Sequence, residues 1–127
     1  MQQLTRAEEE IMQKLWELKA ARVREVLDII PSPKPAYNTV STIIRILEKK
    51  GLVGHKAIGK GFVYYPILKE AEFKKQSIKY LITDYFEGSF SKMASFFAKE
   101  ERLTKEEVDE LLEHLKENHK NENNGSF

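Results

Sequence analysis

Hydrophobic positions in the first half of the chain follow the helical period in three stretches, which are followed by two short β-prone runs. The helical spacing predicts helices at residues 5–19, 22–30 and 37–51, and three closely spaced prolines separate the last two. The β-prone runs, residues 53–58 and 62–66, flank a Gly-Lys-Gly turn and predict a hairpin. Three short helices followed by a hairpin are typical of a winged helix-turn-helix, whose third helix enters the major groove of DNA.

The second half of the chain carries three further amphipathic patterns. A capping box of Thr104 and Glu107 begins the last of them, as Thr5 and Glu8 begin the first helix of the chain. Short helices of this kind cannot bury their apolar faces alone, so they predict a dimerisation surface completed by a second copy of the chain. The residues expected on it are Phe73, Tyr80, Leu81, Phe90, Met93, Phe97, Val108, Leu111, Leu112 and Leu115.

These patterns predict a mainly α protein with a small β-hairpin. We expect a winged-helix DNA-binding domain at residues 1–68 and a helical dimerisation domain at residues 69–117. Residues 118–127 are polar and lack periodicity, which predicts a disordered tail.

The predicted third helix has an unusual outward face. Val40, Ile43, Ile44 and Leu47 form its buried stripe, whereas the other flank carries short hydrogen-bonding side chains that are mediocre helix formers. Such side chains allow a helix to lie deep in a major groove, where Arg pairs with guanine and Asn with adenine. A plain surface helix of modest propensity is the alternative. The candidate DNA-contacting residues of this helix are Tyr37, Asn38, Thr39, Ser41, Thr42, Arg45 and Lys49.

The charge distribution favours the DNA-binding interpretation. The net charge of +1 conceals a first half, residues 1–68, of +4 and a second half of −3. Residues 36–61 carry five basic residues and one acidic residue, so the surplus lies on the third helix and the hairpin. Lys56 and Lys60 of the hairpin are therefore expected to contact phosphates.

Other classes of protein fit the composition poorly. The absence of Cys excludes disulfides and thiolate metal sites, and no apolar run approaches the ~20 residues of a membrane span, so a cytoplasmic protein is expected. His55, His114 and His119 lack the spacing of a metal or catalytic site, and the paired carboxylates lie at helix starts, where they favour the helix dipole. We expect no enzyme activity, no metal and no cofactor.

Three motifs resemble the penicillinase and methicillin-resistance repressors (BlaI/MecI type), a family that also includes copper-operon repressors. They are LTRAEEEIMQKLW at residues 4–16, TVSTIIRILEKKGLV at residues 39–53, and the hairpin ending in FVYYP. The resemblance covers residues 4–116. It implies a homodimeric winged-helix repressor that binds a palindromic operator and dimerises through its C-terminal helices.

The chain departs from the family pattern at several positions. Ile46 precedes Leu47 where family members usually carry Arg, and Arg45 lies one place earlier. The Cys-rich metal sites of the copper-responsive branch are absent. The remaining branch resembles proteins that are inactivated when a membrane sensor protease, or a protease that it activates, cuts the C-terminal domain. The Phe96–Phe97 bond aligns with the bond cut there, with Phe96 in place of Asn.

Two alternatives remain open at this point. A winged-helix module used only for protein–protein contacts predicts no basic surplus on the third helix and hairpin. A ligand-responsive regulator would end repression without proteolysis.

Overall fold

The computed structural model describes residues 3–124 of the chain, with side chains described for residues 3–117. The chain divides into two compact units, one ending at Ile78 and the other beginning at Lys79. The structure is mainly helical with one antiparallel hairpin, as predicted. Its elements are α1 (Arg6–Leu18), α2 (Val23–Asp28), α3 (Tyr37–Lys49), β1 (Val53–Ile58), β2 (Gly61–Pro66), α4 (Glu70–Tyr85), α5 (Phe90–Glu100) and α6 (Lys105–Asn124).

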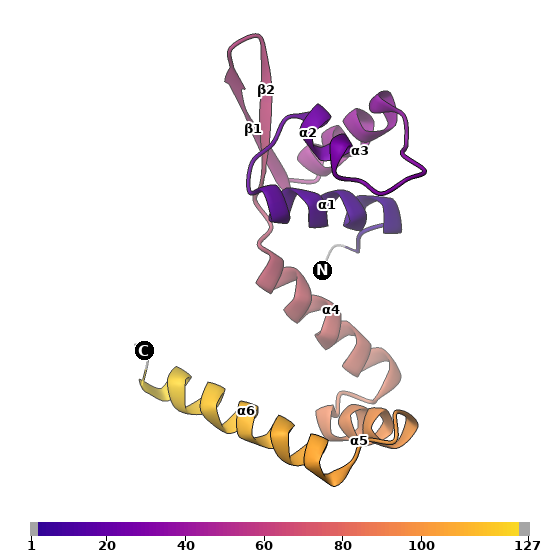
Figure 1. Ribbon diagram of the computed structural model, residues 1–127, viewed down its shortest axis with the longest axis vertical. Helices are drawn as coiled ribbons and strands as arrows, with labels where there is room; N and C mark the ends of the chain where they lie inside the picture. Colours follow the sequence, from indigo (N-terminus) through magenta and orange to yellow (C-terminus); the bar gives the residue numbers. More distant parts are fainter. Residues whose placement is uncertain (1–2, 125–127) are drawn as a thin grey trace. The chain divides into compact units, whose positions relative to one another are not determined.

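The first unit has a winged-helix arrangement. Figure 1 shows α1 lying across the base of α2 and α3, with the hairpin beside them. Most core side chains come from the stripes predicted by helical periodicity, although Ile43 is only half-buried. The buried hydrophobic residues are Ile11, Met12, Leu15, Ala21, Val23, Val26, Leu27, Ile30, Val40, Ile44, Leu47, Val53 and Tyr64.

The hairpin is fixed at both ends. Its turn has Gly59 at the first central position with φ of +64°, as in a type II′ turn, whose twist matches that of the flanking strands. At the base, Tyr64 exchanges two backbone hydrogen bonds of 2.8 Å with Ala21, in the segment that joins α1 to α2. Gly51, with φ of +81°, follows the end of α3 in the left-handed conformation that is common after a helix. The hairpin therefore has a defined position beside α2 and α3.

The proline-containing loop before α3 is held by a lysine. The Lys34 ammonium group donates to the backbone oxygens of Leu27, Asp28 and Ile30 at 3.0, 2.8 and 2.5 Å. These carbonyls lie at the C-terminal end of α2, where a cation is favourable. Lys34 thereby connects the end of α2 to the loop that leads into α3.

The beginning of α4 belongs to the first compact unit, which extends to Ile78. The Trp16 indole N–H donates to the Leu68 carbonyl at 2.8 Å, and the Trp16 and Phe73 rings lie 5.5 Å apart. Phe73, predicted to be a dimerisation residue, is thus half-buried against α1 within its own chain.

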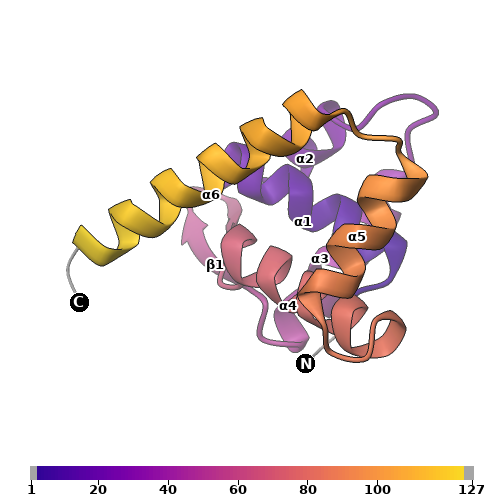
Figure 2. The same ribbon diagram turned by 90° about the horizontal axis from the view of Figure 1, so that it is seen from below.

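The second unit consists of the end of α4 with α5 and α6. Figure 2 shows α5 and α6 as separate helices joined by a short turn. Ser89 caps α5, and the predicted capping box of Thr104 and Glu107 is present at the start of α6. Between Lys79 and Glu117, the structure shows no side chain that is buried.

Helix α6 continues to Asn124 and so includes residues 118–124 of the segment expected to be a disordered tail. Adding residues to an existing helix costs little once its first turns have formed, so an apolar period is not required there. Residues 125–127, also assigned to the tail, lie outside the described part of the chain.

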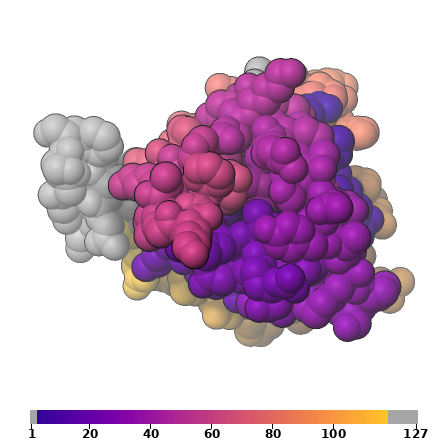
Figure 3. Space-filling view, turned by 90° about the horizontal axis from the view of Figure 1, so that it is seen from above, coloured from indigo at the N-terminus to yellow at the C-terminus, as the bar shows by residue number. Residues whose placement is uncertain are grey.

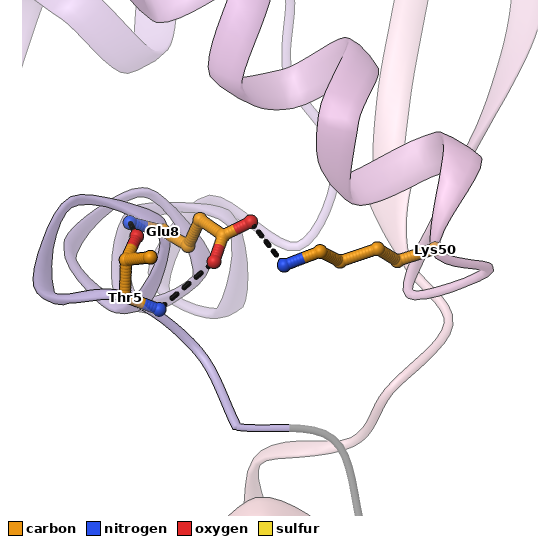
Figure 4. A network of polar contacts seen from close by, with 3 residues as sticks. All are labelled: Thr5, Glu8 and Lys50. Atoms are coloured by element: carbon orange, nitrogen blue, oxygen red, sulfur yellow. Dashed lines mark hydrogen bonds and ion pairs between the residues drawn. The ribbon is translucent and has the colours of Figure 1, made fainter.

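An ion pair joins α1 to the end of α3 (Figure 4). Glu8 is buried, and one carboxylate oxygen accepts from the Lys50 ammonium group at 2.7 Å. The other accepts from the Thr5 backbone N–H at 2.8 Å, which completes the capping box of α1. Burial raises the pKa of Glu8, but the hydrogen bonds from Lys50 and Thr5 lower it by more than burial raises it. The pKa of Glu8 therefore lies below its ordinary value.

Replacing Glu8 by Gln is expected to lower the free energy of unfolding by roughly 1–3 kcal/mol at neutral pH, because a buried charge-assisted hydrogen bond is lost. Since the pKa of Glu8 is lowered by folding, its ionised form stabilises the protein above the ordinary pKa of 4.5. This stabilisation is lost as the pH falls through the lowered value. Denaturant unfolding of the wild type and the Glu8→Gln variant across this pH range measures the difference.

Glu10→Gln, an exposed position on the same helix, is the matched control and should have a small effect. A Glu8→Gln destabilisation that persisted unchanged in strong acid would contradict the role given to the ionised carboxylate.

Candidate nucleic-acid interface

Helix α3 separates its residues between the core and solvent. Val40, Ile44 and Leu47 are completely buried. The opposite side leaves Asn38, Thr39, Thr42, Arg45 and Lys49 exposed, and Tyr37 is exposed at the first turn, whereas Ser41 is half-buried at the edge. The predicted contact residues of α3 therefore lie outside the core and leave an accessible polar face. Arg45 Nη2 donates to Ser41 Oγ at 3.2 Å, so this guanidinium is oriented by a neutral hydroxyl group.

A hollow of about 420 Å³ lies where α2, α3 and the hairpin meet. Figure 3 shows this side of the molecule, with the hairpin in pink beside the violet and magenta helices. Ten residues line the hollow: Arg22, Val23, Arg24, Tyr37, Ser41, Arg45, Lys60, Gly61, Phe62 and Tyr64. Four of them are basic and none is acidic. The hollow is therefore a place where an anion is electrostatically favoured.

The predicted DNA-contacting residues are distributed unevenly around this hollow. Tyr37, Ser41, Arg45 and Lys60 line it. Lys56 pairs with Val63 in the hairpin, so it lies on the strand face opposite Phe62 and Tyr64, and its ammonium group is 5.9 Å from the Tyr65 ring. The structure thus brings Lys60 together with α3 but places Lys56 on the other face of the hairpin.

Sequence reasoning missed two basic residues of the hollow, Arg22 and Arg24. Arg22 Nη2 donates to the Ile58 carbonyl at 2.8 Å, across 36 positions in sequence. The Arg24 guanidinium carbon lies 5.3 Å from the centre of the Tyr37 ring. The available signal was weak: two arginines flank the first residue of a short helix, and only the fold brings them beside the hairpin.

Aromatic residues hold the hairpin against α3. The His55 imidazole contacts the Glu48 carboxylate and packs edge-on against Phe62, with ring centres 4.9 Å apart. Burial raises the pKa of the Tyr64 hydroxyl, and the nearby Glu48 carboxylate raises it further while Arg45 opposes the shift. Tyr64 is therefore neutral at physiological pH and acts as a packing residue at the floor of the hollow.

The second unit presents a different kind of surface. An apolar hollow of about 410 Å³ lies between α5 and α6. Seven of the predicted dimerisation residues line it: Phe90, Met93, Phe97, Val108, Leu111, Leu112 and Leu115. The prediction did not include Ala94, Ala98 and Leu103, which also line it. Tyr80 and Leu81 are exposed on α4 and do not contribute to this hollow.

The Phe96–Phe97 bond lies within α5. Both side chains are more than half exposed, and the Phe96 ring lies 5.6 Å from the Phe86 ring. The backbone on either side of the bond is helical.

The described part of the chain contains no metal site and no membrane-spanning helix. Among the residues that the structure describes, no group of His, Cys, Asp or Glu side chains could hold a metal ion. No helix in the described part of the chain is long and apolar enough to cross a membrane.

Comparison with known proteins identifies the family of this chain. The family model of the penicillinase repressor matches residues 4–117. The chain is 31% identical over 110 residues to the methicillin resistance regulatory protein MecI of Mammaliicoccus sciuri, covering 86% of this chain and 89% of the relative. It is 30% identical over 120 residues to the penicillinase repressor of Bacillus licheniformis, covering 94% and 93% of the two chains. The chain therefore belongs to the penicillinase repressor family of transcriptional repressors.

Proposed function

We propose that this protein represses transcription by binding a palindromic DNA operator as a homodimer, and that proteolysis in its second unit ends repression. The observation that carries the DNA-binding part is the accessible polar face of α3 beside a basic hollow with no acidic lining residue. In this proposal α3 enters the major groove, with Asn38, Thr39, Ser41, Thr42 and Arg45 contacting base edges or the adjacent backbone. The hairpin lies along the phosphates.

The two chemical roles in the interface are separable. Arg45 is held by Ser41 and stays exposed, so it can pair with a guanine edge. Lys60 is exposed at the turn of the hairpin, where an ammonium group can meet a phosphate but reads no sequence. If the winged helix served only for protein–protein contacts, neither Arg45 nor Lys60 would contact DNA.

Arg45→Ala is expected to weaken binding to the operator by about 1–3 kcal/mol and to relax discrimination at one base pair. Lys60→Ala should weaken binding to operator and random duplex alike and lower the salt dependence, the slope of log K against log salt, by about one unit. Titration of both duplexes at several salt concentrations measures these effects. Equal losses on operator and random duplex for Arg45→Ala would remove its base-reading role.

The dimer in this proposal is supported by the exposed apolar surface of the second unit. Helices α5 and α6 leave the apolar hollow accessible, and Leu111, Leu112 and Leu115 are each nearly half exposed. A surface of this kind is stabilised when a second copy covers it. The dimer would present two α3 helices to half-sites about one helical turn, ~10 bp, or somewhat more apart.

Leu112→Glu is expected to convert the dimer to monomers, because each interface would bury an unpaired carboxylate. Operator affinity should fall strongly, since linkage supplies an effective concentration on the order of mM for the second half-site. Sedimentation measures the association, and Glu113→Lys, an exposed polar position, serves as the control. A wild-type protein that stayed monomeric at operator-binding concentrations would contradict the dimer.

Proteolytic relief is proposed at the Phe96–Phe97 bond. Because this bond is helical and a protease cleft binds extended backbone, α5 must open locally before it is cut. The cut would break the covalent connection between α6, which carries Val108, Leu111, Leu112 and Leu115, and the preceding part of the unit. Noncovalent contacts alone would then hold the dimer surface together.

Incubation with the cognate sensor protease should yield fragments ending at Phe96 and beginning at Phe97, identified by mass. Phe96→Asn introduces the residue found before the cut bond in the resembling repressors and should be cut at least as fast. Binding to the operator should slow the cut if it tightens this segment. Induction of the regulated gene with the chain intact would exclude this mechanism and favour a ligand or a partner protein as the signal.

A further inference from the structure

Arg22 and Arg24 are two basic residues that have no part in the contacts with DNA proposed above for α3 and Lys60. Both line the basic hollow, and each is oriented by a neutral group: the Ile58 carbonyl for Arg22 and the Tyr37 ring for Arg24. None of the ion pairs within residues 3–117 involves either side chain. Their charges are thus held in place without being neutralised by a carboxylate.

Other basic residues of this chain show the contrast. Lys50 pairs with Glu8 at 2.7 Å, and Lys92 pairs with Glu87 at 2.7 Å. The carboxylate nearest in sequence to the two arginines, Glu25, accepts a hydrogen bond of 2.8 Å from the Arg22 backbone N–H. It therefore supports the start of α2 and does not pair with either guanidinium group.

Gly61 provides the space that the Arg22 guanidinium occupies. A Cβ atom on Gly61 would lie 2.8 Å from Arg22 Nη1, closer than carbon and nitrogen atoms approach without displacement. The φ angle of Gly61 is not positive, so its backbone does not require glycine. A side chain at position 61 would therefore require the flexible end of Arg22 to move away from its present place.

We propose that Arg22 and Arg24 together bind one backbone phosphate of the DNA, in a seat between α2, α3 and the hairpin. Guanidinium groups are suited to this because they present several N–H donors in a plane that matches phosphate oxygens. The hydrogen bond to Ile58 orders Arg22 before DNA arrives, which reduces the entropy lost on binding. This inference rests on the proposed DNA binding and adds a contact made by α2, which reads no bases.

The test uses the full-length protein and random duplex DNA, because a phosphate contact is independent of sequence. The double variant Arg22→Ala, Arg24→Ala is expected to bind random duplex at least about tenfold more weakly at low salt. Its salt dependence should fall by about one unit, since a single phosphate loses its partners. A fall of about two units, with additive single variants, would mean two separate phosphates and would overturn the shared seat.

Gly61→Ala tests the same seat with both charges retained. The added methyl group should displace the Arg22 guanidinium and weaken duplex binding in the same direction as Arg22→Ala. In an Arg22→Ala background, Gly61→Ala should then have little further effect. If Gly61→Ala weakened duplex binding as much in the Arg22→Ala background as in the wild type, Gly61 would act through the hairpin backbone. Room for the Arg22 guanidinium would then not be its role.

Three controls separate the possible failures. Lys14→Ala removes a charge from a hollow that Glu9 and Glu10 also line, and it should leave the salt dependence almost unchanged. A wild-type protein that binds no duplex at low salt would overturn the proposed function and the seat together. Normal duplex binding by the double variant would overturn the seat alone. Inorganic phosphate that shifted the amide signals of Arg22 and Arg24 at micromolar concentration would indicate a free anion as the ligand.

Discussion

The burial of one side of α3 is the constraint on which the rest of this structure depends. Val40, Ile44 and Leu47 are completely buried and recur at the helical period, so the rotation of the helix about its own axis is determined. Each such side chain contributes about 1.5–3 kcal/mol through burial. The Glu8–Lys50 ion pair joins the end of this helix to α1. The polar face of α3 is consequently directed outward by the energetics of the core.

The hairpin and α2 complete the surface that this helix begins. The backbone pairing of Tyr64 with Ala21 holds the hairpin base, and the Arg22 hydrogen bond to Ile58 holds the region near its turn. Both contacts originate in the segment that starts α2. The same few residues thus place the hairpin and gather basic side chains around one hollow. The second unit differs because its apolar side chains remain accessible to solvent. A second copy of the chain is proposed to cover them.

Local patterns allowed much of this fold to be predicted from the sequence. Capping boxes at Thr5 and Thr104 and the stripe of α3 depend on residues three or four positions apart, which sequence periodicity reveals. The packing of Phe73 on Trp16 could not be predicted in the same way, because helical spacing identifies an apolar face without naming its neighbour. Arg22 was missed for a related reason: its role depends on a carbonyl 36 positions away.

Amide chemical shifts can test whether α3, the hairpin and the start of α2 form one DNA-binding surface. Isotopically labelled protein would be titrated with a duplex, and the perturbed amides would be located on the structure. A single DNA-binding surface predicts changes concentrated in residues 22–24, 37–49 and 56–61, with little change along the outer side of α1. Perturbations confined to α1, or to the apolar hollow between α5 and α6, would contradict it.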